Sequence, residues 1–216
     1  IRAKEVLISS GSIERPLVFG NNDTPGVMLS SAAKEYLKVY GVLVGKNPLV
    51  FTNNDSGYET AIEFKKNGIN PIILDSRVNP QSEIIDEAIN LGIKIKFSYV
   101  VVAAHGYKKV GSADIAKISN DKKQLGTIEN IKCDCICVSG FWTPTIHLAS
   151  QSGNKTKFKE EIDAFVPGTS KQNETTLGAA NGIFTLEETL KDSFTAGQDL
   201  SKKITNNDNK ISFPNV

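Results

Sequence analysis

Apolar residues in the first half of the chain fall into short runs that alternate with segments of helical period. Pro48–Thr52 is a compact apolar run that predicts a buried strand. Asp55-Ser56-Gly57 after it offers N-cap residues for a helix that ends at Asn67-Gly68. A strand, a helix and a third strand are predicted next, at Pro71–Leu74, Ser82–Asn90 and Lys94–Phe97. This β-α-β-α-β order with short loops predicts parallel strands joined by right-handed crossovers.

The flanking segments predict further elements. Glu5–Ser9 indicates a buried strand, and Ser30–Tyr40 carries the apolar stripe of a helix that Gly41 ends. Leu186–Gly197 predicts another helix, and the polar residues 201–216 indicate a linker or disordered tail. Three strand candidates that predict an antiparallel meander added to the sheet are Tyr99–Ala104, Val110–Ile118 and Ile131–Val138.

Composition narrows the class of protein. The 216 residues carry a formal net charge of +1, with 39% hydrophobic and 23% charged residues, as in an ordinary globular protein. Near-neutral charge gives no basis for nucleic-acid binding, and no apolar run is long enough to span a bilayer. We therefore expect a cytoplasmic protein. Because the chain starts at Ile1, directly before a strand, we also expect it to be part of a longer polypeptide.

Cys133, Cys135 and Cys137 occupy every second position of one predicted strand, which would turn all three to one face. Zinc sites usually place turns between their ligands, so this spacing favours buried core thiols and no metal. The sequence also lacks a nucleophile motif such as G-x-S-x-G, and no catalytic residue is predicted.

The segment Leu49–Asp75 has the layout of half a dinucleotide-binding fold. Asp75 stands about 20 residues after the first loop, where an acid would bind a ribose hydroxyl. The G-x-G-x-x-G fingerprint is absent, however, and Thr52–Gly57 stands in its place, with Asp55 where a phosphate would lie. A Rossmann-like structural unit that has lost its ligand is therefore favoured over an NAD site.

Two small-residue turns are candidate contacts for a nucleotide. Ser10-Gly11 follows the first predicted strand, and Leu177–Gly182 is rich in glycine and alanine. Backbone without bulky side chains allows a nucleotide to approach closely. Close packing of a helix on a sheet would use the same residues, and both interpretations remain open.

Several motifs together resemble one family. Ser9–Pro16 resembles the A-T-G-x-x-E-R-P turn of flavoprotein oxidoreductases with two dinucleotide domains, although Ser9-Ser10 replaces the usual Ala-Thr. Other segments that carry the resemblance are Asn21–Met28, Val50–Asp55, Val138–Pro144, His147-Leu148 and Gln151–Gly153. Over residues 2–200, the chain is similar to the alpha subunit of heterotetrameric sarcosine oxidase.

The resemblance implies an activity and a set of cofactors. The family oxidises sarcosine (N-methylglycine) with O2, and folate accepts the one-carbon unit. FAD lies on another subunit, FMN lies between that subunit and alpha, and folate binds a domain absent here. NAD is held by the alpha subunit, and the other subunits, chiefly the flavin-bearing one, are the expected partners.

The resemblance also implies an interrupted domain. Residues 1–43 and 129–200 would be the returning half of an FAD/NAD(P)-binding-type domain, and 44–128 an inserted Rossmann-like domain of the α/β class. Candidate NAD contacts are Ser10, Gly11, Gly178, Ala179 and Asn181. The expected role is to bind cofactor and to scaffold, with no catalysis by the isolated chain.

Two alternatives remain at this stage. The first is an NAD-dependent flavoprotein oxidoreductase of the related amine and opine dehydrogenase group. The second is a non-enzymatic interaction domain with a Rossmann-like fold.

Overall fold

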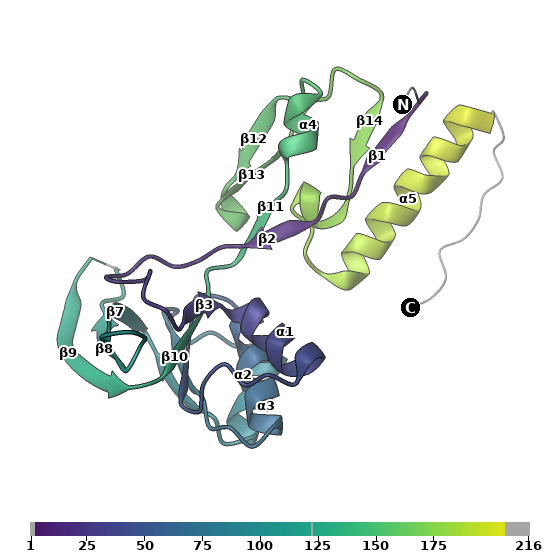
Figure 1. Cartoon of the computed structure of the whole chain (residues 1–216). Coiled ribbons are helices and arrows are strands. Elements are labelled where there is room, and N and C mark those ends of the chain that lie inside the picture. The colour runs from purple at the N-terminus through teal and green to yellow at the C-terminus, as the bar shows by residue number, and fades with distance from the viewer. Residues whose placement is uncertain (1–2, 122, 206–216) are drawn as a thin grey trace. The chain divides into compact units, whose positions relative to one another are not determined.

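The chain divides into two compact units in the computed structural model, which describes residues 3–121 and 123–205. Unit 2 is the continuous segment Glu14–Phe141, and unit 1 consists of the segments before and after it, up to Ile13 and from Trp142. Figure 1 traces the elements of both units. Unit 2 therefore interrupts unit 1 in the sequence.

The helices are α1 (Ser30–Tyr40), α2 (Ser56–Lys66), α3 (Glu83–Asn90), α4 (His147–Gln151) and α5 (Leu186–Thr205), with 3-10 turns η1 (Glu160–Ile162) and η2 (Gly178–Asn181). The strands before residue 100 are β1 (Val6–Ile8), β2 (Ser12–Glu14), β3 (Val27–Leu29), β4 (Pro48–Thr52), β5 (Ile72–Asp75) and β6 (Lys94–Phe97). Those that follow are β7 (Tyr99–His105), β8 (Ser112–Ile118), β9 (Leu125–Lys132), β10 (Cys135–Ser139), β11 (Trp142–Pro144), β12 (Thr156–Lys159), β13 (Ala164–Pro167) and β14 (Glu174–Thr176).

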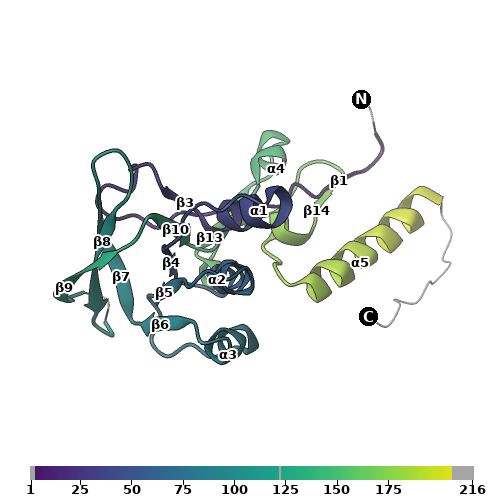
Figure 2. The same cartoon turned by 60° about the horizontal axis from the view of Figure 1, so that its bottom comes forward.

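Unit 2 is built on a five-stranded parallel sheet of order β3-β10-β4-β5-β6. Figure 2 shows α1, α2 and α3 on one face and the antiparallel sheet β7-β8-β9 on the other. Every residue of β4 is buried, as expected for a parallel strand covered on both faces. Along β4, Leu49 and Phe51 pack toward the antiparallel sheet while Val50 packs toward the helices, so the strand joins both cores.

The predicted α/β class and parallel β-α-β-α-β unit are confirmed. The predicted meander is corrected, because Ile131–Val138 is not one strand. Its first residues end β9, and Cys135–Ser139 forms β10 in the parallel sheet. The Asp134 carboxylate separates them by accepting the backbone N–H groups of Lys46 and Asn47, each at 2.8 Å.

This break also separates the cysteines. All three are free and buried, as the core interpretation predicts. Cys135 and Cys137 face the helices, whereas Cys133, which precedes β10, packs in the core beside the antiparallel sheet. The prediction that all three share one face was therefore wrong. Burial raises the pKa of the Cys133 thiol to about 12, which keeps it protonated.

The compact units differ from the expected domain boundaries, which placed the insert at 44–128 and its host at 1–43 and 129–200. β10 pairs with both β3 and β4, and α1 contacts α2, so these outer elements belong to unit 2. The expected tail at 201–216 also differs, because α5 continues to Thr205. Residues 206–216 lie outside the described residues.

Unit 1 contains short two-stranded sheets and one long helix. β1 pairs with β14 in parallel, β12 pairs with β13, and β11 pairs with β2. Helix α5 runs alongside the β1–β14 pair (Figures 1 and 2) and has no buried residue. Over the residues that are described, no helix is both long and apolar enough to cross a bilayer.

Two glycines in helices provide a matched test of this packing. A Cβ on Gly57 would lie 2.6 Å from the Cβ of Thr52, whereas a Cβ on Gly197 would meet nothing within 4 Å. We expect Gly57→Ala to destabilise unit 2 by about 1–3 kcal/mol through overpacking. Gly197→Ala should stabilise α5 by up to about 1 kcal/mol through helix propensity. Amide hydrogen exchange in β4 and in α5 measures both effects, and unchanged exchange of β4 in Gly57→Ala would contradict the packing described.

Candidate functional site

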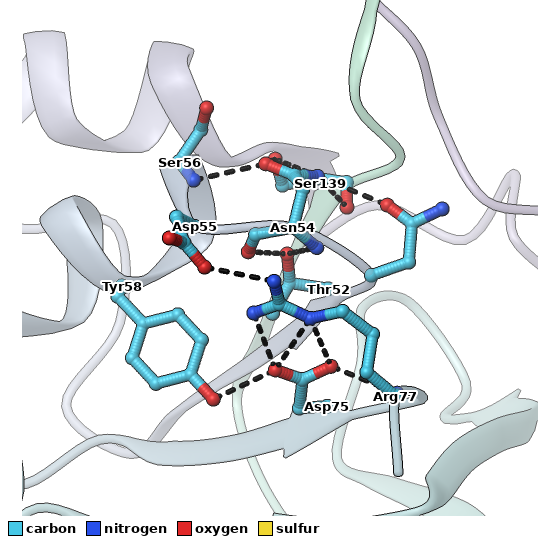
Figure 3. A network of polar contacts seen from close by, with 9 residues as sticks. Thr52, Asn54, Asp55, Ser56, Tyr58, Asp75, Arg77 and Ser139 are labelled. Carbon is cyan, nitrogen blue, oxygen red and sulfur yellow. Dashed lines mark hydrogen bonds and ion pairs between the residues drawn. The ribbon is translucent and has the colours of Figure 1, made fainter. Parts of the chain in front are cut away.

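The carboxyl edge of the parallel sheet in unit 2 gathers the polar residues shown in Figure 3. The chain runs from β4 through β5 to β6 in one direction and returns to place β10 on the other side of β4. The order of the strands therefore reverses between β4 and β10. In open α/β sheets, ligands bind at the carboxyl ends of the strands at such a switch point.

Asn54 bridges this switch point. Its side-chain Nδ2 donates to the Ser139 carbonyl at the end of β10 at 3.0 Å, and its Oδ1 accepts the Ser56 N–H at the start of α2 at 2.9 Å. Thr52, the last residue of β4, fixes the turn by donating from Oγ1 to the Asn54 carbonyl at 2.8 Å. The side chain of Asn54 is thus buried where a ligand would enter (Figure 3).

Asp75, at the end of β5, is fully buried. Its Oδ2 accepts the Tyr58 hydroxyl at 2.7 Å and Arg77 Nη2 at 2.8 Å, and its Oδ1 accepts the Arg77 backbone N–H at 2.9 Å. Arg77 Nη1 also contacts the Asp55 carboxylate at 2.8 Å. Figure 3 shows the guanidinium between the two acids. The acid expected to bind ribose is therefore occupied by residues of this chain.

The network also shifts the pKa values of its members. Burial, followed by the hydrogen bond to Asp75, raises the pKa of Tyr58 far above its usual range. Burial opposes the charge of Arg77, but hydrogen bonds and charges of Asp75 and Asp55 raise the pKa of its guanidinium. Tyr58 therefore acts as a hydrogen-bond donor, and Arg77 remains a cation between two carboxylates.

This edge of unit 2 does not fit a dinucleotide. The backbone approach that glycines permit is blocked by Asn54, and the ribose position holds Asp75 already paired with Arg77. The charges of Asp55, Asp75 and Arg77 sum to −1, which disfavours a phosphate.

In unit 1, the structure brings the two predicted small-residue turns together. β1 and β14 are parallel neighbours, with Ile8 opposite Thr176. The Leu177 N–H donates to the Ile8 carbonyl at 2.9 Å. Ser10-Gly11 follows β1 and η2 follows β14, so both turns lie at the carboxyl edge of one strand pair.

The local geometry of these turns differs from the expected helix start. Gly178, Ala179 and Asn181 form the short 3-10 turn η2, and the Gly178 N–H donates to the Asp192 carboxylate at 2.9 Å. Gly11 has φ +72°, and a Cβ there would meet nothing within 4 Å. Ser10 donates to the Thr145 carbonyl at 2.7 Å. Gly11 thus has open space at its Cβ position, although its carbonyl accepts the Thr145 N–H at 3.0 Å, and the first N–H of η2 already has an anionic partner.

The sequence assigned no role to Tyr58 or Arg77, whereas Asn54 belongs to the segment Thr52–Gly57 that was predicted to be unsuited to a nucleotide. The asparagine pair Asn53-Asn54 in place of glycines was a visible signal for a filled turn. The pairing of Tyr58 and Arg77 with Asp75 depends on how α2 lies over β5, which the sequence pattern alone does not contain.

Comparison with known proteins identifies the relationship. No family model matches the chain. Sarcosine oxidase subunit alpha of Corynebacterium sp. (strain P-1) is 33% identical over 199 residues, which are 91% of this chain and 20% of that protein. The same subunit of Rhizobium meliloti (strain 1021) is 35% identical over 188 residues, or 83% of this chain and 17% of that protein.

The chain is homologous to one segment of the sarcosine oxidase alpha subunit. The resemblance drawn from the sequence motifs is thereby confirmed. The chain spans about a fifth of the length of these relatives.

Solved structures show the same fold in flavoprotein oxidoreductases. T. acidophilum thioredoxin reductase has a TM-score of 0.75 at 18% identity, covering 94% of this chain and 67% of the reductase. L-proline dehydrogenase from P. horikoshii has a TM-score of 0.61 at 20% identity, covering 94% of this chain and 35% of that one. The chain therefore has the fold of these oxidoreductases over most of its length.

Removing the Tyr58 hydroxyl should destabilise unit 2. Tyr58→Phe deletes one hydrogen bond to a buried carboxylate, which costs about 1.5–3 kcal/mol. Tyr107→Phe, at a residue 96% exposed, should change stability by less than about 0.5 kcal/mol. Urea unfolding of the two variants checks this difference, and equal midpoints would contradict the role of Tyr58.

The raised pKa of Tyr58 predicts a pH dependence. Below the ordinary tyrosine pKa of about 10, the hydroxyl is protonated in both states and its stabilisation is complete. As pH rises through about 10, only the unfolded state ionises, so stability falls. In a spectrophotometric titration of the folded protein, Tyr58→Phe should therefore lose no ionising tyrosine relative to wild type. Loss of one would contradict the assignment.

Proposed function

We propose that this chain is the cofactor-binding and scaffolding segment of a sarcosine oxidase alpha subunit. The observation that carries the proposal is the match at 33% identity over 199 residues, supported by the shared fold. Because the chain spans about a fifth of those relatives, we assign the activity to the complete, cytoplasmic enzyme. That enzyme would oxidise sarcosine with O2 and folate, using FAD and FMN held outside this segment.

NAD is the cofactor proposed for unit 1. Ser10, Gly11, Gly178, Ala179 and Asn181 would hold it, because they lie at the carboxyl edge of the parallel pair β1–β14. The open space at the Cβ position of Gly11 favours close approach of a nucleotide. NAD can accept a hydride when bound, whereas these side chains would only hold and orient it.

The exposed apolar surface of unit 1 supports a scaffolding role. Val6 and Leu7 of β1 are 46% and 38% exposed, and α5 buries none of its residues. A helix of 20 residues usually buries an apolar stripe against a neighbour. We propose that unit 1 is part of a larger FAD/NAD(P)-binding-type domain, completed by other parts of the enzyme.

Unit 2 offers a surface for a partner subunit. Five large apolar side chains cluster at the end of α1 and just after it, and all are exposed: Tyr36, Val39, Tyr40, Val42 and Leu43. Such patches, especially with tyrosines, are typical of protein interfaces. We propose the flavin-bearing subunit as the partner.

The reaction is tested with the complete enzyme. The complete alpha subunit that contains this chain is co-expressed with its partner subunits. The assembled enzyme should consume O2 when sarcosine is added. The chain of 216 residues alone should consume none. Oxygen uptake by the isolated chain would overturn the scaffolding role, and an inactive but fully assembled, flavin-loaded enzyme would overturn the substrate assignment.

The NAD site is tested by matched glycine substitutions. Gly11 and Gly92 have φ +72° and +70°, and a Cβ at either would meet nothing within 4 Å. Both alanine variants should therefore bear a similar strain of roughly 1–2 kcal/mol. In titrations of the complete subunit with NAD, Gly11→Ala should weaken binding about tenfold or more, and Gly92→Ala should leave it unchanged. Equal affinities would remove Gly11 from the site.

A further inference from the structure

We propose that Arg77 and Asn54 replace a dinucleotide in unit 2, so that this Rossmann-like unit is complete without a cofactor. The proposal concerns a different unit from the one proposed to hold NAD and does not depend on the substrate of the enzyme. It assigns to two side chains the positions that a ligand takes in related folds.

Asn54 occupies the position that a ligand would take at the switch point. A ligand at the switch point would lie between the ends of β4 and β10. The side-chain amide of Asn54 spans that gap with one hydrogen bond to Ser139 and one to Ser56. The residue is 6% exposed. The Asn53 backbone N–H also donates to the Ser139 carbonyl, at 3.3 Å. The Ser56 N–H at the start of α2, which could otherwise bind a pyrophosphate, thus donates within the chain.

Arg77 occupies the carboxylate that would bind a ribose. Asp75 is fully buried and carries a charge that must be compensated. Arg77 supplies Nε and Nη2 to its carboxylate, and Tyr58 supplies a hydroxyl. No oxygen of Asp75 is without a partner for a ribose to use. Arg77 Nη1 also binds Asp55 at the same edge, so the guanidinium is held by two carboxylates.

The charges at this edge also disfavour a phosphate. Asp55 stands at the N-cap of α2, where the helix dipole favours an anion. Its carboxylate already supplies that anion, and Arg77 neutralises one of the two local acids. A nucleotide phosphate would have to approach two carboxylates and compete with them for Arg77.

The experiment combines nucleotide titration with a substitution at Arg77 in the chain of 216 residues. NAD, NADP and FAD are each titrated to millimolar concentration while the backbone amide signals of residues 53–57 and 75–77 are followed by NMR. These signals should not move. Shifts confined to residues 10–11 and 178–181 would concern the NAD site of unit 1 and would agree with an inert unit 2.

The substitution compares Arg77→Met with Lys66→Met. Lys66 forms an exposed ion pair with Glu87 at 2.9 Å, so its loss should leave exchange of the β5 amides unchanged. Arg77→Met leaves Asp75 buried without its cation and should speed exchange of those amides by roughly a hundredfold or more. Arg77→Lys should restore part of the protection of the β5 amides from exchange. It restores the positive charge but not the planar guanidinium that binds a carboxylate through two N–H groups.

Two results would overturn the proposal. Nucleotide-induced shifts at residues 53–57 or 75–77 in the wild-type chain would show that the edge accepts a ligand. Equal exchange in Arg77→Met and Lys66→Met would show that Arg77 does not complete unit 2.

Discussion

The buried carboxylate of Asp75 is the constraint on which the arrangement of unit 2 depends. A charge with no access to water must be paired, and Tyr58 on α2 and Arg77 after β5 pair it. The same guanidinium reaches Asp55 at the start of α2. One carboxylate therefore fixes the helix to the strand, and this fixation fills the edge where a nucleotide would bind.

The two units differ in the chemistry at the carboxyl edges of their parallel strands. In each unit, turns that follow neighbouring parallel strands meet at one edge. In unit 2 that edge carries Asn54, Asp75 and Arg77, which bind one another. In unit 1 it carries Ser10-Gly11, with open space at the Cβ position of Gly11, and η2, whose Gly178 N–H donates to Asp192. The proposed cofactor-binding role rests on the edge of unit 1.

The sequence predicts local elements well where a period and a stop signal coincide. Ser30–Tyr40 was predicted with the bounds that α1 has, since an apolar stripe ends at Gly41. The strand Ile131–Val138 was wrong because its alternation continues through Asp134, and only the contacts of that side chain with the loop before β4 reveal the break. The absence of the glycine fingerprint predicted that the turn at residues 52–57 is unsuited to bind a dinucleotide. It could not predict Arg77 as the replacement, because that depends on three elements meeting in space.

The most direct measurement is a crystal structure of the complete subunit grown with NAD. The account predicts nucleotide density beside Gly11 and Gly178 in unit 1, with Arg77 still bound to Asp75 and Asp55 in unit 2. Nucleotide density at residues 53–57, with Arg77 turned away from Asp75, would contradict it.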